Sequence, residues 1–126
     1  MKYEVGVLHS HLHILNSEDI SERIVDYVIL NVHHSALSLR NLSIHYDIED
    51  DNNNLPNALF NLQSTLQELD IDQIRRIDLS AELNSMINIM QDPNYSNKKN
   101  NEFIIDITNE VNRINQRFLE GKTNSK

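Results

Sequence analysis

The stretch from Phe103 to Phe118 reads FIIDITNEVNRINQRF, and it decides the fold class of this chain. Its apolar residues recur at spacings of three and four. One set at these spacings is Phe103, Ile107, Val111, Ile114 and Phe118. Side chains spaced in this way share one face of an α-helix, because the helix completes a turn about every 3.6 residues. We therefore predict an amphipathic helix whose apolar face packs against other helices.

Two earlier stretches repeat this periodicity. The apolar stripe of the first consists of Val25, Val28, Val32, Ala36 and Leu39. Ile24, Ile29 and Leu30 widen it, so we expect that helix to be central and buried on more than one side. The second stretch has a narrow seam suited to a partner helix, formed by Leu55, Leu59, Leu62, Leu66 and Leu69. We expect a core that includes Val28, Val32, Leu62, Leu66, Ile107, Val111 and Ile114.

Several residues predict where helices begin and end. Ser17 is expected to cap the helix that follows it, because a serine side chain can accept from the first free amides. Pro56 suits a first helical turn, where a missing N–H costs nothing. Gly121 is a plausible stop for the last helix, which leaves residues 121–126 as an expected disordered tail.

A further apolar pattern follows the leucine seam. Its members are Ile74, Ile77, Ala81, Leu83, Ile87 and Met90. We predict a helix capped by Asp70 or Asp72. Asp92-Pro93 should end it, because a residue before proline avoids the helical conformation.

The N-terminal segment from Lys2 to Leu15 fits two patterns. Tyr3, Val5 and Val7 alternate as in a strand, whereas Leu8 and the later leucines have helical spacing. We favour the helix. The chain has only two glycines and two prolines, which argues against a β-rich fold joined by tight turns. We predict an all-α fold, a compact single-domain bundle of four to five helices over residues 1–120.

Composition excludes several classes of protein. Rossmann, P-loop and kinase folds cradle phosphates with glycine-rich loops, and two glycines cannot supply one. There is no cysteine, so disulfides and thiolate metal sites are excluded. Glu4 and His9 interrupt the N-terminal apolar residues where a secretory signal needs a continuous run. No run could span a bilayer. We therefore expect a cytoplasmic protein with no membrane partner.

Negative charge is concentrated in the middle of the chain. Of the formal net charge of −8, residues 47–92 hold ten acidic and two basic residues, which is −8 by itself. Residues 1–46 hold five acidic and three basic residues, and residues 93–126 hold four acidic and six basic ones. Proteins bind nucleic acid through positively charged surfaces, so we expect no direct contact between this chain and nucleic acid. A basic protein would be attracted.

Histidines and acids are candidates for metal binding. Five of the six histidines lie at positions 9, 11, 13, 33 and 34, and His9 and His13 would share a helix face at a spacing that can bind zinc. No paired His-Glu-x-x-His accompanies them, and the favoured interpretation is a polar face or hydrogen-bonded histidines. The acids after Asp47 lack the glycine and final glutamate of an EF-hand. We expect no bound metal or cofactor.

The segment from Arg40 to Tyr46, RNLSIHY, resembles the Arg-x4-His signature of the HEPN family of helical-bundle ribonucleases and their relatives. The resemblance covers seven residues and implies that Arg40 holds a phosphate while His45 moves a proton as general acid or base. In that family the signature lies near the final helix, whereas here only two predicted helices precede it.

The leading hypothesis is a small acidic interaction domain without catalytic activity. An immunity protein or antitoxin that neutralises a basic toxin, such as a nuclease, fits best, because nucleases are basic to bind an anionic substrate. A HEPN-like ribonuclease and a secretion or assembly chaperone are the alternatives. The expected partner-binding residues are Asp47, Glu49, Asp50, Asp51, Glu68, Asp70, Asp72, Asp78 and Glu82.

Overall fold

The computed structural model describes residues 2–17, 21–44, 54–93 and 100–123, and within them it contains six helices and no strand. The helices are α1 Lys2–Leu15, α2 Glu22–Ile44, α3 Asn54–Gln67, α4 Ile71–Arg75, α5 Ser80–Gln91 and α6 Asn100–Thr123. This confirms the predicted all-α bundle, with five long helices and the single turn of α4.

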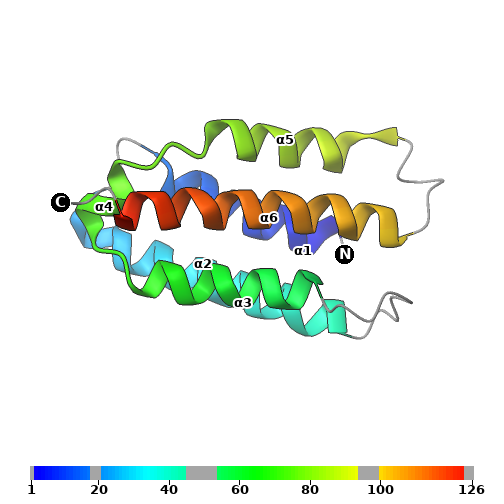
Figure 1. Ribbon diagram of the computed structural model, residues 1–126, viewed down its shortest axis with the longest axis horizontal. Helices are drawn as coiled ribbons and strands as arrows, with labels where there is room; N and C mark the ends of the chain where they lie inside the picture. Colours follow the sequence, from blue (N-terminus) through cyan, green and yellow to red (C-terminus); the bar gives the residue numbers. More distant parts are fainter. Residues whose placement is uncertain (1, 18–20, 45–53, 94–99, 124–126) are drawn as a thin grey trace.

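The five long helices close around one core. In the ribbon view, α6 runs through the middle with α5 on one side and α3 on the other, and α4 lies at the end near the C-terminus (Figure 1). α1 contacts α2 and α5, α2 contacts α3, and α6 contacts both α3 and α5. Each long helix therefore has two neighbours in a ring, and each buries its apolar stripe toward the centre.

The predicted core is confirmed. The apolar stripes of α2, α3 and α6 are buried along their whole predicted length. They belong to one continuous cluster of apolar side chains, to which α1, α4 and α5 also contribute. The core members predicted from spacing are all buried, namely Val28, Val32, Leu62, Leu66, Ile107, Val111 and Ile114. A helical hydrophobic period thus located the inner face of each long helix.

The N-terminal segment is a helix, as favoured, and not a strand. In α1 the buried side chains are Val5, Leu8, Leu12 and Leu15, at spacings of three, four and three. Tyr3, which would pair with Val5 and Val7 in a strand-like alternation, is largely exposed. Burial of one helical face decides the conformation, because a strand would put the leucines on both sides.

Two predictions about α2 are wrong. Ile24 and Leu30 are about half exposed, so this helix is buried on one side only. Its first turn starts after Ser21, whose carbonyl accepts from the amides of Ile24 and Val25 at 3.1 and 3.2 Å. Ser17 does not cap it. Its amide donates to the Ile14 carbonyl at 3.0 Å and so closes the last turn of α1.

The helix predicted between residues 70 and 91 is divided into α4 and α5. Asp70 is the N-cap of α4, with a capping box in which its carboxylate accepts from the Gln73 amide and the Gln73 side chain accepts from the Asp70 amide. Between the helices, Asp78 accepts from the amide and hydroxyl of Ser80 at 2.9 and 2.6 Å. Asp92 is the C-cap of α5, as its proline neighbour predicts.

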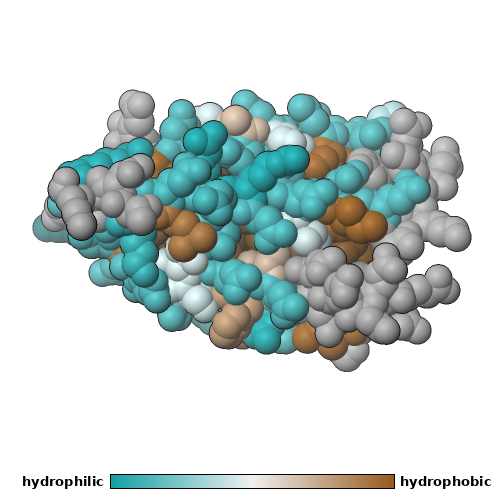
Figure 2. All heavy atoms as spheres, in the orientation of Figure 1, coloured by the Kyte–Doolittle hydropathy of each residue, from teal (hydrophilic) through white to brown (hydrophobic). Residues whose placement is uncertain are grey.

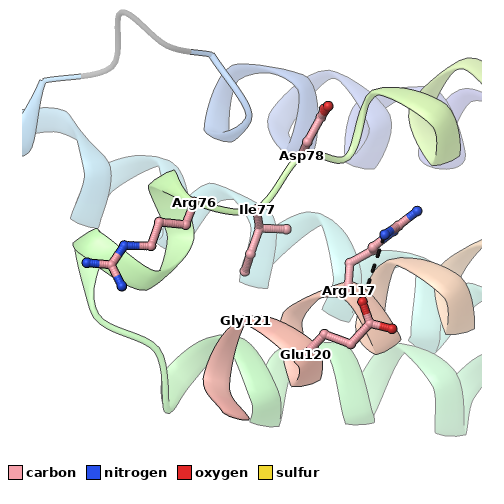
Figure 3. Close-up of a pocket in the computed structure, with 6 residues that line it drawn as sticks. All are labelled: Arg76, Ile77, Asp78, Arg117, Glu120 and Gly121. Atoms are coloured by element: carbon pink, nitrogen blue, oxygen red, sulfur yellow. Dashed lines mark ion pairs between the residues drawn. The ribbon is translucent and has the colours of Figure 1, made fainter. Parts of the chain in front are cut away.

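Gly121 does not stop α6, which continues to Thr123. A Cβ atom at this position would lie 2.6 Å from Cδ1 and 2.7 Å from Cγ1 of Ile77. The glycine therefore allows the α4–α5 connection to approach the last turns of α6 closely, as the close-up shows (Figure 3). Of the expected tail at residues 121–126, residues 121–123 belong to α6, and residues 124–126 lie outside the described residues.

Candidate partner-binding site

The nine acids predicted to bind a partner are distributed over three environments. Asp47, Glu49, Asp50 and Asp51 lie outside the described residues. Asp70 and Asp72 lie together beside a groove on the surface. Glu68, Asp78 and Glu82 lie elsewhere, and each interacts with other residues of the chain. The groove is therefore the part of the predicted site that the structure brings together.

A groove of about 400 Å³ lies between the N-terminal part of α2 and the α3–α4 connection, and we call it the acidic groove. Its lining residues are Asp26, Ile29, Leu69, Asp70, Ile71 and Asp72. The three aspartates are exposed, Leu69 is buried, and the two isoleucines are half-buried against the core. The groove thus combines three carboxylates with an apolar base.

Local structure fixes the acids of the α3–α4 connection. The Asp70 carboxylate accepts from the Gln73 amide through Oδ1 at 2.8 Å, and this capping contact holds its side chain at the groove. Asp72 lies in the first turn of α4, where a negative charge is favoured by the exposed helix amides. Asp26 reaches the same groove from α2.

An acidic groove of this kind suits a lysine or arginine side chain. The aliphatic part of such a side chain can cover Ile29, Leu69 and Ile71 while its cationic end meets the carboxylates. Arginine also donates in a planar fork that matches carboxylate oxygens. The arrangement therefore fits a basic segment.

Asp26 was not among the site residues predicted from the sequence. It lies outside residues 47–92, where the acids are concentrated, although Glu18, Asp19 and Glu22 precede it closely in the sequence. Only the contact between α2 and the end of α3 brings it beside Asp70 and Asp72. A more general signal was present, because Asp26 lies off the predicted apolar stripe of its helix and is exposed.

Glu82 is not available on the surface. It is buried on α5, and its Oε1 accepts from Nε of Arg117 on α6 at 2.7 Å. Glu110 is a second buried carboxylate between the same two helices, and it accepts from the Ser85 hydroxyl at 2.9 Å and pairs with Arg113. These interactions connect α5 to α6, so Glu82 stabilises the bundle in place of contacting a partner.

Glu68 and Asp78 also have contacts within the chain. Glu68 forms an ion pair with Lys122 on the exposed surface. Asp78 accepts from the Ser80 hydroxyl and amide, and these hydrogen bonds, helped by nearby Arg117, hold the pKa of its carboxyl below the usual value. Neither residue lines the acidic groove.

A second pocket, of about 280 Å³, lies beside Asp78 where α4 meets the end of α6 (Figure 3). Its lining residues are Arg76, Ile77, Asp78, Arg117, Glu120 and Gly121. Arg117 lies 3.8 Å from Glu120 and also pairs with Glu82, and the Glu82 hydrogen bond raises the pKa of the Arg117 guanidinium. In Figure 3, Arg76 points away from Arg117. Because the two arginines of this pocket are matched by two acidic residues and point apart, the pocket does not form an anion-binding site.

The clustered histidines have structural contacts. The rings of His9 and His13 are stacked with centroids 6.2 Å apart. Nε2 of His9 donates to the Leu83 carbonyl at 3.0 Å and so connects α1 to α5, while His11 contacts the Ser35 hydroxyl on α2. Among the described residues, no group of three or more His, Cys, Asp or Glu side chains could hold a metal ion.

Stability should fall in mild acid because of two partly buried histidines. Burial lowers the pKa of His9, and burial together with neighbouring His34 lowers the pKa of His33. The unfolded chain therefore binds protons first as the pH drops below about 6.5, which favours unfolding. Stability should be complete above that pH and decline toward the lowered folded-state pKa values.

Urea unfolding at several pH values between about 7.5 and 5.5 tests this expectation. The double variant His9→Gln/His33→Gln should show a flatter profile of unfolding free energy than the wild type over this window. His13→Gln, which changes an exposed histidine, should retain most of the slope. An equal slope in the wild type and the double variant would contradict the assignment to these two residues.

Arg40 packs against an aromatic ring. Its guanidinium lies 5.1 Å from the ring centroid of Phe60, so it connects α2 to α3 by a cation–π contact. His45, the second residue of the Arg-x4-His resemblance, lies outside the described residues.

No helix within the described ranges is long and apolar enough to cross a membrane. Comparison of the chain with protein-family models, with curated proteins and with solved structures finds no match.

Proposed function

We propose that this chain is an interaction domain that binds a basic protein through the acidic groove. The observation that supports this most directly is the meeting of Asp26, Asp70 and Asp72 around apolar side chains from α2 and the α3–α4 connection. Three exposed carboxylates in one groove create a negative potential that attracts a cationic segment. The half-buried isoleucines offer apolar contact to the same segment.

The partner that best suits this surface is a basic toxin, such as a nuclease, which the domain would neutralise as an immunity protein or antitoxin in the cytoplasm. Nucleases carry positive charge at their substrate-binding face, because their substrate is a polyanion. An acidic protein placed over that face blocks it, and attraction between the two surfaces accelerates their association. The formal net charge of −8 extends this attraction beyond the groove itself.

Charge reversal in the groove tests the proposal. In Asp26→Lys/Asp72→Lys, we expect association with the basic partner to slow by about tenfold or more and to depend less on salt, because steering and local pairing are both lost. The matched control Glu102→Lys/Glu120→Lys changes the net charge equally on α6, away from the groove. It should reduce association much less.

The partner is recovered by affinity capture from the source cells, and binding kinetics are measured at low and high ionic strength. Its toxic or nuclease activity is then assayed with and without each variant. An acidic partner, or equal effects of the groove and control reversals, would exclude the groove as the binding surface. A basic partner that binds at the groove but keeps its activity would exclude neutralisation while leaving the binding proposal in place.

A further inference from the structure

The outward side of α2 carries a second stripe of side chains that none of the other described helices covers. We call this the outer seam, and its members are Tyr27, Leu30, His34, Leu37, Asn41 and Ile44. All six are exposed. They follow one another at alternating spacings of three and four, which is the periodicity of a helix that packs lengthwise against another helix.

Exposed apolar residues are concentrated on this side of the molecule. Of the ten large hydrophobic side chains that are exposed among the described residues, four belong to the outer seam and a fifth, Tyr3, lines the groove beside it. The opposite face, where α3, α5 and α6 lie toward the viewer, is mainly hydrophilic with small separate apolar patches (Figure 2). A concentration of apolar surface on one side of a soluble bundle marks an interaction site.

The charge distribution favours a second copy of this chain as the occupant. The protein has a formal net charge of −8, so two copies repel over most of their surfaces. Residues 27–39, however, contain no Asp, Glu, Lys or Arg. This stretch lets another copy approach with few like charges in contact, because the nearby acids are confined to its edges, with Asp26 directly before it in sequence and Glu4 in the adjoining groove.

The order of residues in the outer seam is self-complementary. Spacings of three, four, three, four and three read the same in both directions, so two antiparallel α2 helices bring every seam position opposite another. Tyr27 then meets Ile44 of the second copy, and His34 meets Leu37 of the second copy. Antiparallel packing also places the positive end of each helix dipole beside the negative end of the other.

A groove beside the seam provides space for the second copy. It has a volume of about 420 Å³ and lies between α1 and α2, where Tyr3, Val7, His34 and Ser38 are among its lining residues. Because a two-fold axis near His34 and Leu37 relates the copies, a leucine that projects from one copy can enter the groove of the other. An isologous dimer brings the same face of both copies together, so that face must carry both the projecting side chain and the groove that receives it.

The seam and the groove beside it supply a large part of the area that a dimer needs. Tyr3 and Tyr27 are 79% and 69% exposed, and aromatic side chains bury about 150–250 Å² each, so these two can supply on the order of 300 Å². A standard interface buries about 800 Å² on each partner. α2 extends for about 34 Å, and its half-exposed seam residues Leu30, Leu37 and Ile44 contribute further apolar area.

We therefore infer that the chain forms an antiparallel homodimer through the outer seam of α2. The inference does not depend on the proposed basic partner. Sedimentation analysis of the wild type over a range of concentrations should give twice the monomer mass of 14.7 kDa. A mass that remains at 14.7 kDa at all concentrations would overturn it.

Substitutions locate the interface. Leu30→Glu/Leu37→Glu should weaken dimerisation by about a hundredfold or more, because four carboxylates would be buried together. Both leucines are half exposed, so circular dichroism should show an intact helical fold. The matched control Ile105→Glu/Leu119→Glu, on α6, should remain dimeric. Dimers that persist in the seam variant, or that disappear equally in the control, would place the interface elsewhere.

Cysteine cross-linking tests the direction of packing, and the absence of natural cysteine makes it specific. In Tyr27→Cys/Ile44→Cys, oxidation should connect position 27 of one copy to position 44 of the other. The two positions on one helix are about 26 Å apart, too far for a bond within the chain. Ile44→Cys alone should not cross-link. Cross-linking of that single variant, or none in the double variant, would contradict antiparallel packing.

Discussion

Replacing Phe118 by alanine is expected to lower the free energy of unfolding by about 3–5 kcal/mol. Phe118 is 1% exposed and is among the largest fully buried side chains of the described residues. It lies on α6, which contacts α3, α4 and α5. Truncation would remove its transfer free energy and leave a cavity where several helices meet, and the rest of a close-packed core can close such a cavity only in part.

The adjacent residue provides a matched control. Leu119 is 39% exposed on the same helix turn, so Leu119→Ala should change the free energy of unfolding by less than about 1 kcal/mol. Urea unfolding followed by circular dichroism measures both variants. Domains of this size are stable by about 5–15 kcal/mol, so the Phe118 variant should lose a large part of its stability. Equal losses in the two variants would contradict the central position of α6.

Replacing Arg117 by methionine is expected to destabilise the fold more than any other charge substitution among the described residues. Arg117 is the cation that pairs with the buried Glu82 carboxylate, at 2.7 Å from Nε to Oε1. Without Arg117, the Glu82 carboxylate remains buried between α5 and α6 without its cation. This lowers the stability of the fold more than removing both charged groups does. Part of the loss is relieved by water, because the Arg117 side chain is 49% exposed.

A double-mutant comparison separates this effect from lost packing. Glu82→Met/Arg117→Met should be more stable than Arg117→Met alone, since the second substitution removes the unpaired carboxylate. Arg76→Met serves as a control, because it removes an exposed arginine that forms no ion pair with the described residues, and it should have little effect. Thermal and urea unfolding measure all four proteins. A double variant less stable than the single one would show that Glu82 is stabilised without Arg117.

Helix boundaries show where local sequence was sufficient. Asp70 was one of two predicted caps, and it is the N-cap because Gln73 lies three residues later and completes the capping box. Asp92 ends α5 because Pro93 follows it. Both depend on residues within one turn. The prediction that Ser17 caps α2 was wrong, because the helix begins after Ser21, which lies directly before Glu22. Local sequence does not decide which of the two serines precedes the first helical turn.

The break between α4 and α5 could not be predicted, because part of its cause is distant in sequence. No glycine or proline interrupts residues 71–91. The Leu79 amide, which would otherwise belong to a continuous helix, donates to Oδ1 of Asn16 at 3.0 Å, from the end of α1. The role of Gly121 within α6 could not be predicted either, because it depends on the position of Ile77, which is distant in sequence.

The sequence by itself determined the helical fold class and the inner face of each long helix, because both follow from the spacing of apolar residues along a 3.6-residue period. It also placed Asp70 and Asp72 in the candidate site through the concentration of acids. Only the tertiary structure decided that Asp26 joins them, that Glu82 is buried against Arg117, and that the described helices leave the outer side of α2 exposed. These features depend on which helices are neighbours. Helical periodicity predicts which face of a helix is buried, but it does not predict which other helix packs against that face.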